Sequence, residues 1–133
     1  MSAIIGSGGI RHKGIHVETS AFPWNLALSV VLADVGKAMA VDPSANCTAK
    51  LAGDGDRVIG VLASFEDRVT EGLRVGTIEH QGGFEFAYTG AITLGASVEG
   101  SATAGSVKAA AAKNGTLVTS IDAGAGTCQV VML

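Results

Sequence analysis

The sequence is poor in charge, proline, cysteine and aromatic side chains, and each shortage excludes a class of protein. Charged residues make up 16% of the 133 residues, hydrophobic residues 47% and aromatic residues 5%. A chain this apolar and weakly charged is expected to fold rather than to remain disordered. With 2 prolines it is not collagen, and with 2 cysteines it is not a disulfide scaffold. No apolar run approaches the roughly 20 residues of a membrane-spanning helix, so we expect no membrane segment.

The few charges are scattered, and their balance is slightly acidic. The formal net charge is -3, and the densest basic group is Arg11, His12 and Lys13. Proteins that bind nucleic acid through its phosphates usually gather Lys and Arg on one face, so we expect no nucleic-acid partner. The N-terminus lacks the regions of a signal peptide. We therefore expect synthesis in a cytoplasm, where Cys47 and Cys128 would be free, buried thiols.

The beginning of the chain differs from the rest. Residues 1–24 contain several glycines and show no lasting helical or strand periodicity, and Pro23 lies near their end. We interpret residues 1–24 as an extended arm and residues 25–133 as one folded domain. Trp24 is the only tryptophan, and it lies where an arm could be anchored to the domain or to a neighbour. An ordinary core position is an equally good interpretation of Trp24.

From residue 25 onward, short apolar or alternating segments are separated by turns rich in glycine. The expected strands are residues 25–32, 37–41, 57–64, 73–79, 84–88, 91–94, 96–99, 107–110, 117–121 and 127–133. Residues 65–71 are expected to form a loop. Short strands at spacings of about 8–12 residues are typical of an all-β sandwich or barrel. The expected fold class is therefore a small, single-domain, all-β barrel or sandwich with an extended N-terminal arm.

Residues 106–113 leave two alternatives open. They contain four consecutive alanines, which favour a helix by propensity. The segment is short for an independent helix, and Gly105 and Gly115 lie on either side of it. A strand and a short helix are therefore equally supported.

Two features indicate how the strands pack. Gly60 lies inside an apolar segment, which predicts a bulge or a close approach of two backbones. Phe84, Phe86 and Tyr88 alternate along one expected strand and share a face. Aromatic side chains arranged in this way usually fill the core of a small barrel, so we expect them in the core rather than at an interface.

Two motifs near the N-terminus suggest ligand chemistry, but each lacks a required residue. Residues 4–9 (I-I-G-S-G-G) look like a strand followed by a phosphate-binding turn, yet Arg11 stands where the dinucleotide fingerprint requires glycine. His12 and His16 have the spacing of two metal ligands on a helical turn, but Lys13 replaces the glutamate of the metalloprotease motif. We expect neither a nucleotide site nor a metal site.

Catalytic signals are equally sparse. Asp54 and Asp56 offer two carboxylates, but Val58 and Ile59 stand where a calcium loop needs oxygen ligands, so an exposed turn is expected. The sequence contains no G-x-S-x-G nucleophile motif, and nothing in it meets the requirements of a catalytic constellation. We expect a protein that is not an enzyme and that needs no cofactor.

A series of short Gly, Ala and Val segments resembles a known family. The segments are residues 35–42 (VGKAMAVD), 58–62 (VIGVL), 76–80 (GTIEH) with Gly82 and Gly83 after it, 88–91 (YTGA) and 95–98 (GASV). Over about residues 26 to 133, their order is similar to that of the small capsid cement proteins, also called head decoration proteins, of tailed bacteriophages.

The resemblance implies a compact, barrel-like β domain on the outer surface of an icosahedral head. Such a protein binds the major capsid protein as a homo-oligomer, with a trimer favoured over a dimer. It clamps neighbouring capsomers against the pressure of packaged DNA. Neither catalysis nor a cofactor is implied. We expect the chain to be made in the cytoplasm of a host bacterium and to reside on the virion.

The expected contact residues lie in the arm and directly after it. A protein that stabilises only an assembled shell gains from weakly charged surfaces, which cost little to desolvate. An extended arm can add a strand to the sheet of a neighbour. The expected capsid or inter-subunit contacts are Ile4, Ile5, Ile10, Ile15, Phe22 and Trp24.

The alternative function is a virion- or cell-surface module that recognises a host glycan. Sugar sites usually place exposed aromatic rings beside polar groups. Only Trp24 and Tyr88 are candidates for such rings, which argues mildly against this function.

Overall fold

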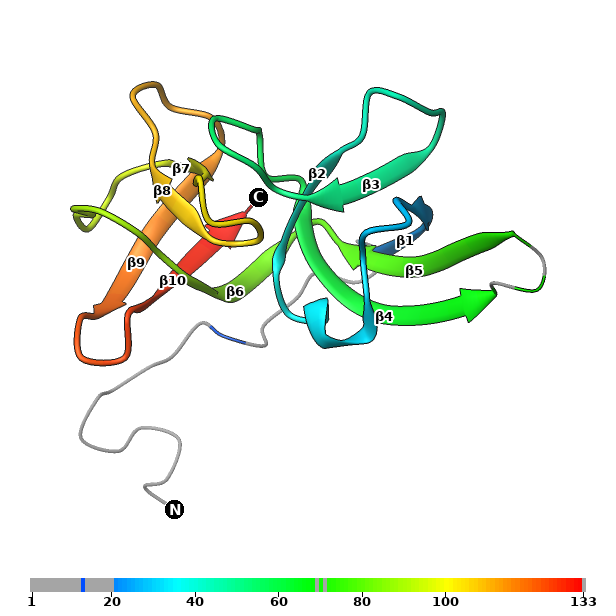
Figure 1. Ribbon diagram of the computed structural model, residues 1–133. Helices are drawn as coiled ribbons and strands as arrows, with labels where there is room; N and C mark the ends of the chain where they lie inside the picture. Colours follow the sequence, from blue (N-terminus) through cyan, green and yellow to red (C-terminus); the bar gives the residue numbers. More distant parts are fainter. Residues whose placement is uncertain (1–12, 14–20, 69, 71, 133) are drawn as a thin grey trace, which may run out of the picture.

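The computed structural model describes residues 13, 21–68, 70 and 72–132, which form an all-β protein (Figure 1). The elements are β1 (Ala21–Leu26), a short 3-10 turn η1 (Leu32–Asp34), β2 (Ala38–Val41), β3 (Thr48–Leu51), β4 (Gly60–Arg68), β5 (Leu73–Glu79), β6 (Gly82–Ala87), β7 (Val98–Gly100), β8 (Val107–Ala109), β9 (Thr116–Asp122) and β10 (Thr127–Met132). The expected all-β fold class is confirmed. Among the described residues, no helix is long and apolar enough to cross a lipid bilayer.

Five of the strands close into a barrel in the order β1-β3-β2-β4-β5. β1 pairs with β5 along its whole length, but with β3 only at Asn25 and Leu26. Among the described residues, no strand therefore pairs with the other side of the first part of β1, where Pro23 lies. Pro23 is opposite Thr77, whose N–H donates to the Ser64 hydroxyl on β4. Pro23 and Thr77 therefore share no ladder hydrogen bond, so the missing N–H of proline leaves no strand hydrogen bond unmade.

The barrel begins earlier than the sequence indicates. β1 starts at Ala21, so residues 21–24 are part of the barrel and not of the arm. The physical reason is the alternation of Phe22 and Trp24, since Trp24 packs against the barrel core with Leu26. Apart from Lys13, the rest of the expected arm lies outside the described residues, and this includes Ile4, Ile5, Ile10 and Ile15.

The remaining strands form two smaller sheets beside the barrel, on the left of Figure 1. One is antiparallel with the order β6-β10-β9, and the other is the pair β7-β8. Backbone hydrogen bonds join these sheets to the barrel. Gly105 accepts from the Ala38 N–H and donates to Ala52, and Gly100 exchanges bonds with Gly55 and Asp56.

β2 is buried on both of its faces. Met39 belongs to the core inside the barrel, which also contains Leu26, Val30, Ala49, Leu62 and Ile78. Ala38 and Ala40 point the other way, into a second core with Phe84, Phe86, Val98, Val107, Val118, Cys128, Val130 and Met132. Since successive side chains of a strand face opposite sides, one short strand serves both cores.

Several expectations about packing are confirmed. Phe84 and Phe86 are core residues, and Tyr88 is partly buried against them. Gly60 marks a close backbone approach, because a Cβ at this position would lie 2.1 Å from the Glu79 carbonyl oxygen. For residues 106–113 the structure selects the strand: residues 107–109 form β8, which pairs with β7.

Other strand expectations are wrong. The apolar run 25–32 leaves the sheet after Leu26 and turns into η1, and residues 91–94 form no strand. Conversely, β4 continues through residues 65–68, where a loop was expected, because β5 pairs with it as far as Arg68. Residues 47–51, which were not among the expected strands, contain β3.

Enlarging a side chain on the second face of β2 is expected to destabilise the fold. Ala40→Leu adds volume at a position that is 2% exposed between two sheets, and overpacking of this kind costs about 1–3 kcal/mol. Val41→Leu is the matched control, since Val41 on the same strand is 50% exposed and should change the free energy of unfolding by less than about 0.5 kcal/mol. Urea unfolding of both variants measures the difference. Equal stability of the two would contradict the packing of β2 against both cores.

Candidate functional site

Phe22 and Trp24, the two expected contact residues that the structure describes, meet at His80. The Trp24 Nε1–H donates to His80 Nε2 at 3.1 Å, and His80 Nδ1 lies 2.8 Å from the Ile59 carbonyl oxygen. His80 Nε2 therefore accepts, and Nδ1 carries the proton that is donated to Ile59. The Phe22 ring also contacts the imidazole, with 5.1 Å between ring centroids, and Phe22 is 56% exposed. Trp24 is half-buried and holds His80 in place.

His80 is a site residue that the sequence did not reveal. It lies between β5 and β6, and 56 positions separate it from Trp24. The antiparallel pairing of β1 with β5 brings the two together, since Ala21 lies opposite Glu79. No local pattern encodes this contact, so only knowledge of the strand pairing could have predicted it.

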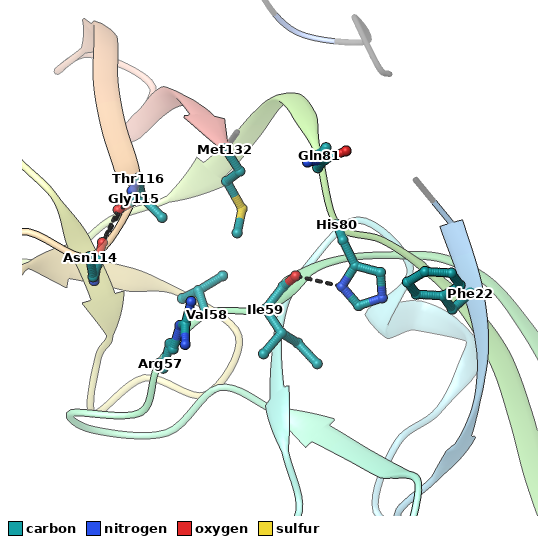
Figure 2. Close-up of a pocket in the computed structure, with 10 residues that line it drawn as sticks. All are labelled: Phe22, Arg57, Val58, Ile59, His80, Gln81, Asn114, Gly115, Thr116 and Met132. Atoms are coloured by element: carbon teal, nitrogen blue, oxygen red, sulfur yellow. Dashed lines mark hydrogen bonds between the residues drawn. The ribbon is translucent and has the colours of Figure 1, made fainter. Parts of the chain in front are cut away.

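A cavity of about 540 Å³ lies where the barrel meets the β6-β10-β9 sheet. Figure 2 shows Arg57 and Asn114 at one end of this cavity and His80 and Phe22 at the other, with Ile59 and Met132 between them. We call this the junction cavity. One wall is supplied by the barrel, and the other by residues 114–116 and the end of β10.

Most polar groups in the wall of the junction cavity form hydrogen bonds within the protein. The Asn114 amide donates to the Val98 carbonyl at 2.7 Å and accepts from the Thr116 hydroxyl at 2.6 Å. Both ring nitrogens of His80 are used, as described above. Arg57 differs, since it is exposed and its guanidinium has no partner among the described residues.

A second surface feature is a group of exposed apolar side chains between β1 and β2. Leu28, Val31, Leu32 and Val35 are 71%, 46%, 67% and 41% exposed. We call these residues the apolar crown. A shallow cavity of about 370 Å³ lies beside it, lined by Val31, Leu32, Phe65, Asp67 and Arg74. Exposed apolar side chains that gather in one segment are unusual on a monomer and mark interaction surfaces.

The backbone beneath the apolar crown is held by polar side chains. Arg74 on β5 donates through Nη1 to the carbonyls of Leu28 and Val30, the latter at 2.9 Å. The Asp34 carboxylate accepts from the Val31 N–H at 2.9 Å and from Lys37 at 3.0 Å. The crown is therefore a preformed surface, because these bonds fix its turns without a partner.

The two carboxylates of the residues 53–56 turn are engaged in ion pairs. Asp54 binds Lys108 at 2.6 Å, and Asp56 accepts from the Gly53 N–H and pairs with Lys50 at 3.2 Å. Over the residues that the structure describes, no three His, Cys, Asp or Glu side chains gather as they would around a metal ion. The expected turn is confirmed.

The two cysteines have different environments. Cys128 is buried in the second core, as expected, and burial together with the nearby Glu85 charge raises the pKa of its thiol to about 11. Cys47 is exposed, which contradicts the expectation that both thiols are buried. It precedes β3 in a turn with a positive φ of 52°, where the chain reverses on the surface.

The sequence matches no protein-family model, and it has no significant match among curated proteins. The function must therefore be argued from the residues and their arrangement.

Thiol labelling is expected to separate the two cysteines. Iodoacetamide at about pH 8 should alkylate Cys47 in the folded protein and leave Cys128 unmodified, because a buried thiol with a raised pKa supplies almost no thiolate. In urea both should react. Mass spectrometry of the intact protein and of its peptides counts the modified sites. Rapid modification of Cys128 without denaturant would contradict its position in the core.

The apolar crown is expected to loosen in acid through Asp34. Burial acts to raise the pKa of this carboxyl, but the hydrogen bonds from Val31 and Lys37 and the Lys37 charge outweigh it, so the pKa lies below its ordinary value of 3.8. A lowered pKa contributes stability that is complete above the ordinary value and is lost as the pH falls through the folded-state value.

Asp34→Asn should therefore lower the free energy of unfolding by about 1–2 kcal/mol at neutral pH, and by less at about pH 3. Urea unfolding at both pH values measures this. Asp54→Asn is the control, since Asp54 is 62% exposed and its ion pair should contribute little at either pH. An Asp34→Asn effect that does not depend on pH would exclude the carboxylate's charge as the source.

Proposed function

We propose that this protein is a structural virion protein that binds the outside of an icosahedral head of a tailed phage. It stabilises contacts between capsomers of the major capsid protein against the internal pressure of DNA. It acts as a homo-oligomer, with a trimer favoured, and needs no cofactor.

The observation that carries this proposal is the apolar crown. Leu28 and Leu32 are about two-thirds exposed or more, at 71% and 67%, on a backbone fixed by Arg74 and Asp34. Covering large apolar side chains contributes about 25 cal/mol per Å² of buried surface. A preformed apolar surface loses little conformational entropy on binding, which suits a permanent contact with another protein.

The segments that resemble cement proteins also have a structural role in this chain. Residues 35–42 contain β2, and residues 58–62 and 76–80 contain the close approach between β4 and β5. Gly60 and Gly76 lie in this approach, and a Cβ on either would meet a backbone carbonyl at under 2.5 Å, at 2.1 and 2.4 Å respectively. Three of the five segments that carry the resemblance therefore contain residues that build the barrel.

The mechanism of stabilisation is preferential binding to the assembled state. A protein that binds the mature shell and not separated capsomers stabilises the shell by RT ln(1 + [L]/Kd) at each site. A symmetric oligomer binds several capsomers at once, so weak individual contacts combine into high avidity. No bond is made or broken in this process.

The glycan-binding alternative receives less support. Trp24 and Tyr88, the two candidate aromatic residues, are both partly buried, and the Trp24 N–H is already bonded to His80. Neither presents a free aromatic face beside unused polar groups.

A charge placed in the apolar crown is expected to abolish head binding. Leu32→Glu should reduce binding to heads that lack the protein by at least about tenfold, because a carboxylate would have to be desolvated in the contact. Leu94→Glu is the matched control: Leu94 is also 67% exposed, but it lies between β6 and β7.

Cosedimentation of purified protein with expanded heads measures the binding, and the temperature at which the heads release DNA measures the stabilisation. If the wild-type protein neither binds the heads nor raises this temperature, the proposed function is wrong. If Leu32→Glu binds as well as Leu94→Glu, the crown is not the contact.

A further inference from the structure

We propose that the junction cavity receives a segment of the major capsid protein that presents a carboxylate beside a large apolar side chain. The inference rests on the proposed function for the identity of the partner, and it adds a second contact with a different chemistry from the apolar crown.

The junction cavity has two unlike ends. Figure 2 shows the Arg57 guanidinium at one end and the Phe22 ring next to His80 at the other. Between them, Ile59 and Met132 supply apolar walls. A ligand that fills the whole cavity must therefore carry an anionic group at one end and an apolar or aromatic group at the other.

The apolar end is rigid before any ligand arrives. Two hydrogen bonds fix the His80 ring, one from Trp24 and one to the Ile59 carbonyl. Phe22 packs on this ring at 5.1 Å between centroids and keeps 56% of its surface exposed. An apolar side chain that covers Phe22 would find its partner surface already in position, so binding costs little ordering.

The charge of the cavity is set by Arg57. Neither Asp nor Glu is among the described residues that line the cavity, and the Asn114 amide is already hydrogen-bonded to Val98 and Thr116. Arg57 has no partner among the described residues. A guanidinium in this setting favours a carboxylate, because its planar N–H groups match two carboxylate oxygens.

The size of the cavity also suits a short protein segment. Its volume of about 540 Å³ falls within the roughly 300–1,000 Å³ range of ligand pockets. It opens between the barrel and the neighbouring sheet, so an extended segment can enter from solvent. A docked carboxylate and apolar side chain would bridge the two parts of the fold.

Two peptides test the recognition without any head. The probes are N-acetyl-Phe-Gly-Glu-amide and its Gln counterpart, added up to about 10 mM, where contacts with Kd near 1 mM are visible. Trp24 is the only tryptophan, and its indole N–H is bonded to His80 in the cavity wall, so its NMR signal reports occupancy.

The Glu peptide should shift the Trp24 signal saturably, and the Gln peptide should bind about two- to fivefold more weakly. In Arg57→Gln the difference between the peptides should vanish. Equal binding of both peptides to the wild type, or no shift with either, would overturn the proposal.

Binding to phage heads is the second test of the proposal. Arg57→Gln should weaken binding to heads by about fivefold at low salt and should reduce its salt dependence. Arg68→Gln is the control, since it removes the same charge from an exposed position on the β4–β5 hairpin.

If Arg57→Gln and Arg68→Gln bind heads equally well, the junction cavity does not contact the major capsid protein. Binding of the wild-type protein to heads would still support the proposed function. If the wild type does not bind heads at all, the proposed function fails, and the peptide titration shows separately whether the cavity recognises a carboxylate.

Discussion

The structure depends on one short strand, β2, whose two faces are both packed and which is shared by two cores. Met39 fills the barrel, while Ala38 and Ala40 face the second core, so both cores meet at one strand. Only small side chains allow this spacing. At Gly100, where the second part of the fold meets the turn after β3, a Cβ would lie 2.0 Å from the Gly53 carbonyl oxygen. At Gly60, Gly76 and Gly100 the absence of a side chain is thus a packing requirement, since a Cβ there would meet a backbone carbonyl.

The small number of large side chains in the interior also affects which apolar residues lie on the surface. The interior is filled by relatively few large apolar residues, because the strands lie close together. Leu28, Val31, Leu32 and Val35 remain outside both cores, although Arg74 and Asp34 hold their backbone firmly. An apolar segment fixed by polar anchors and left exposed has no explanation in the stability of the monomer. This segment is the surface through which we propose that the protein contacts the capsid.

The sequence pattern predicted the parts of the fold that depend on residues close together in the chain. Alternation located residues 73–79 and 84–88, and glycine marked the close approach at residue 60. The apolar run 25–32 was misleading, because its second half is turned out of the sheet by Arg74, which lies far away in the sequence. The same limit applies to the site: Phe22 and Trp24 were expected as contact residues, but His80 becomes their neighbour only through the pairing of β1 with β5.

Several of the few charged side chains are used in ion pairs within the protein. Lys37, Lys50 and Lys108 each pair with a carboxylate on the chain itself. These charges are already compensated, so they present little net field to a partner. In the proposed function, the apolar crown would bind through burial, which depends weakly on salt, whereas Arg57 would bind through its charge, which salt screens. A protein with both contacts would hold a shell mainly through the crown, and Arg57 would select the segment that enters the junction cavity.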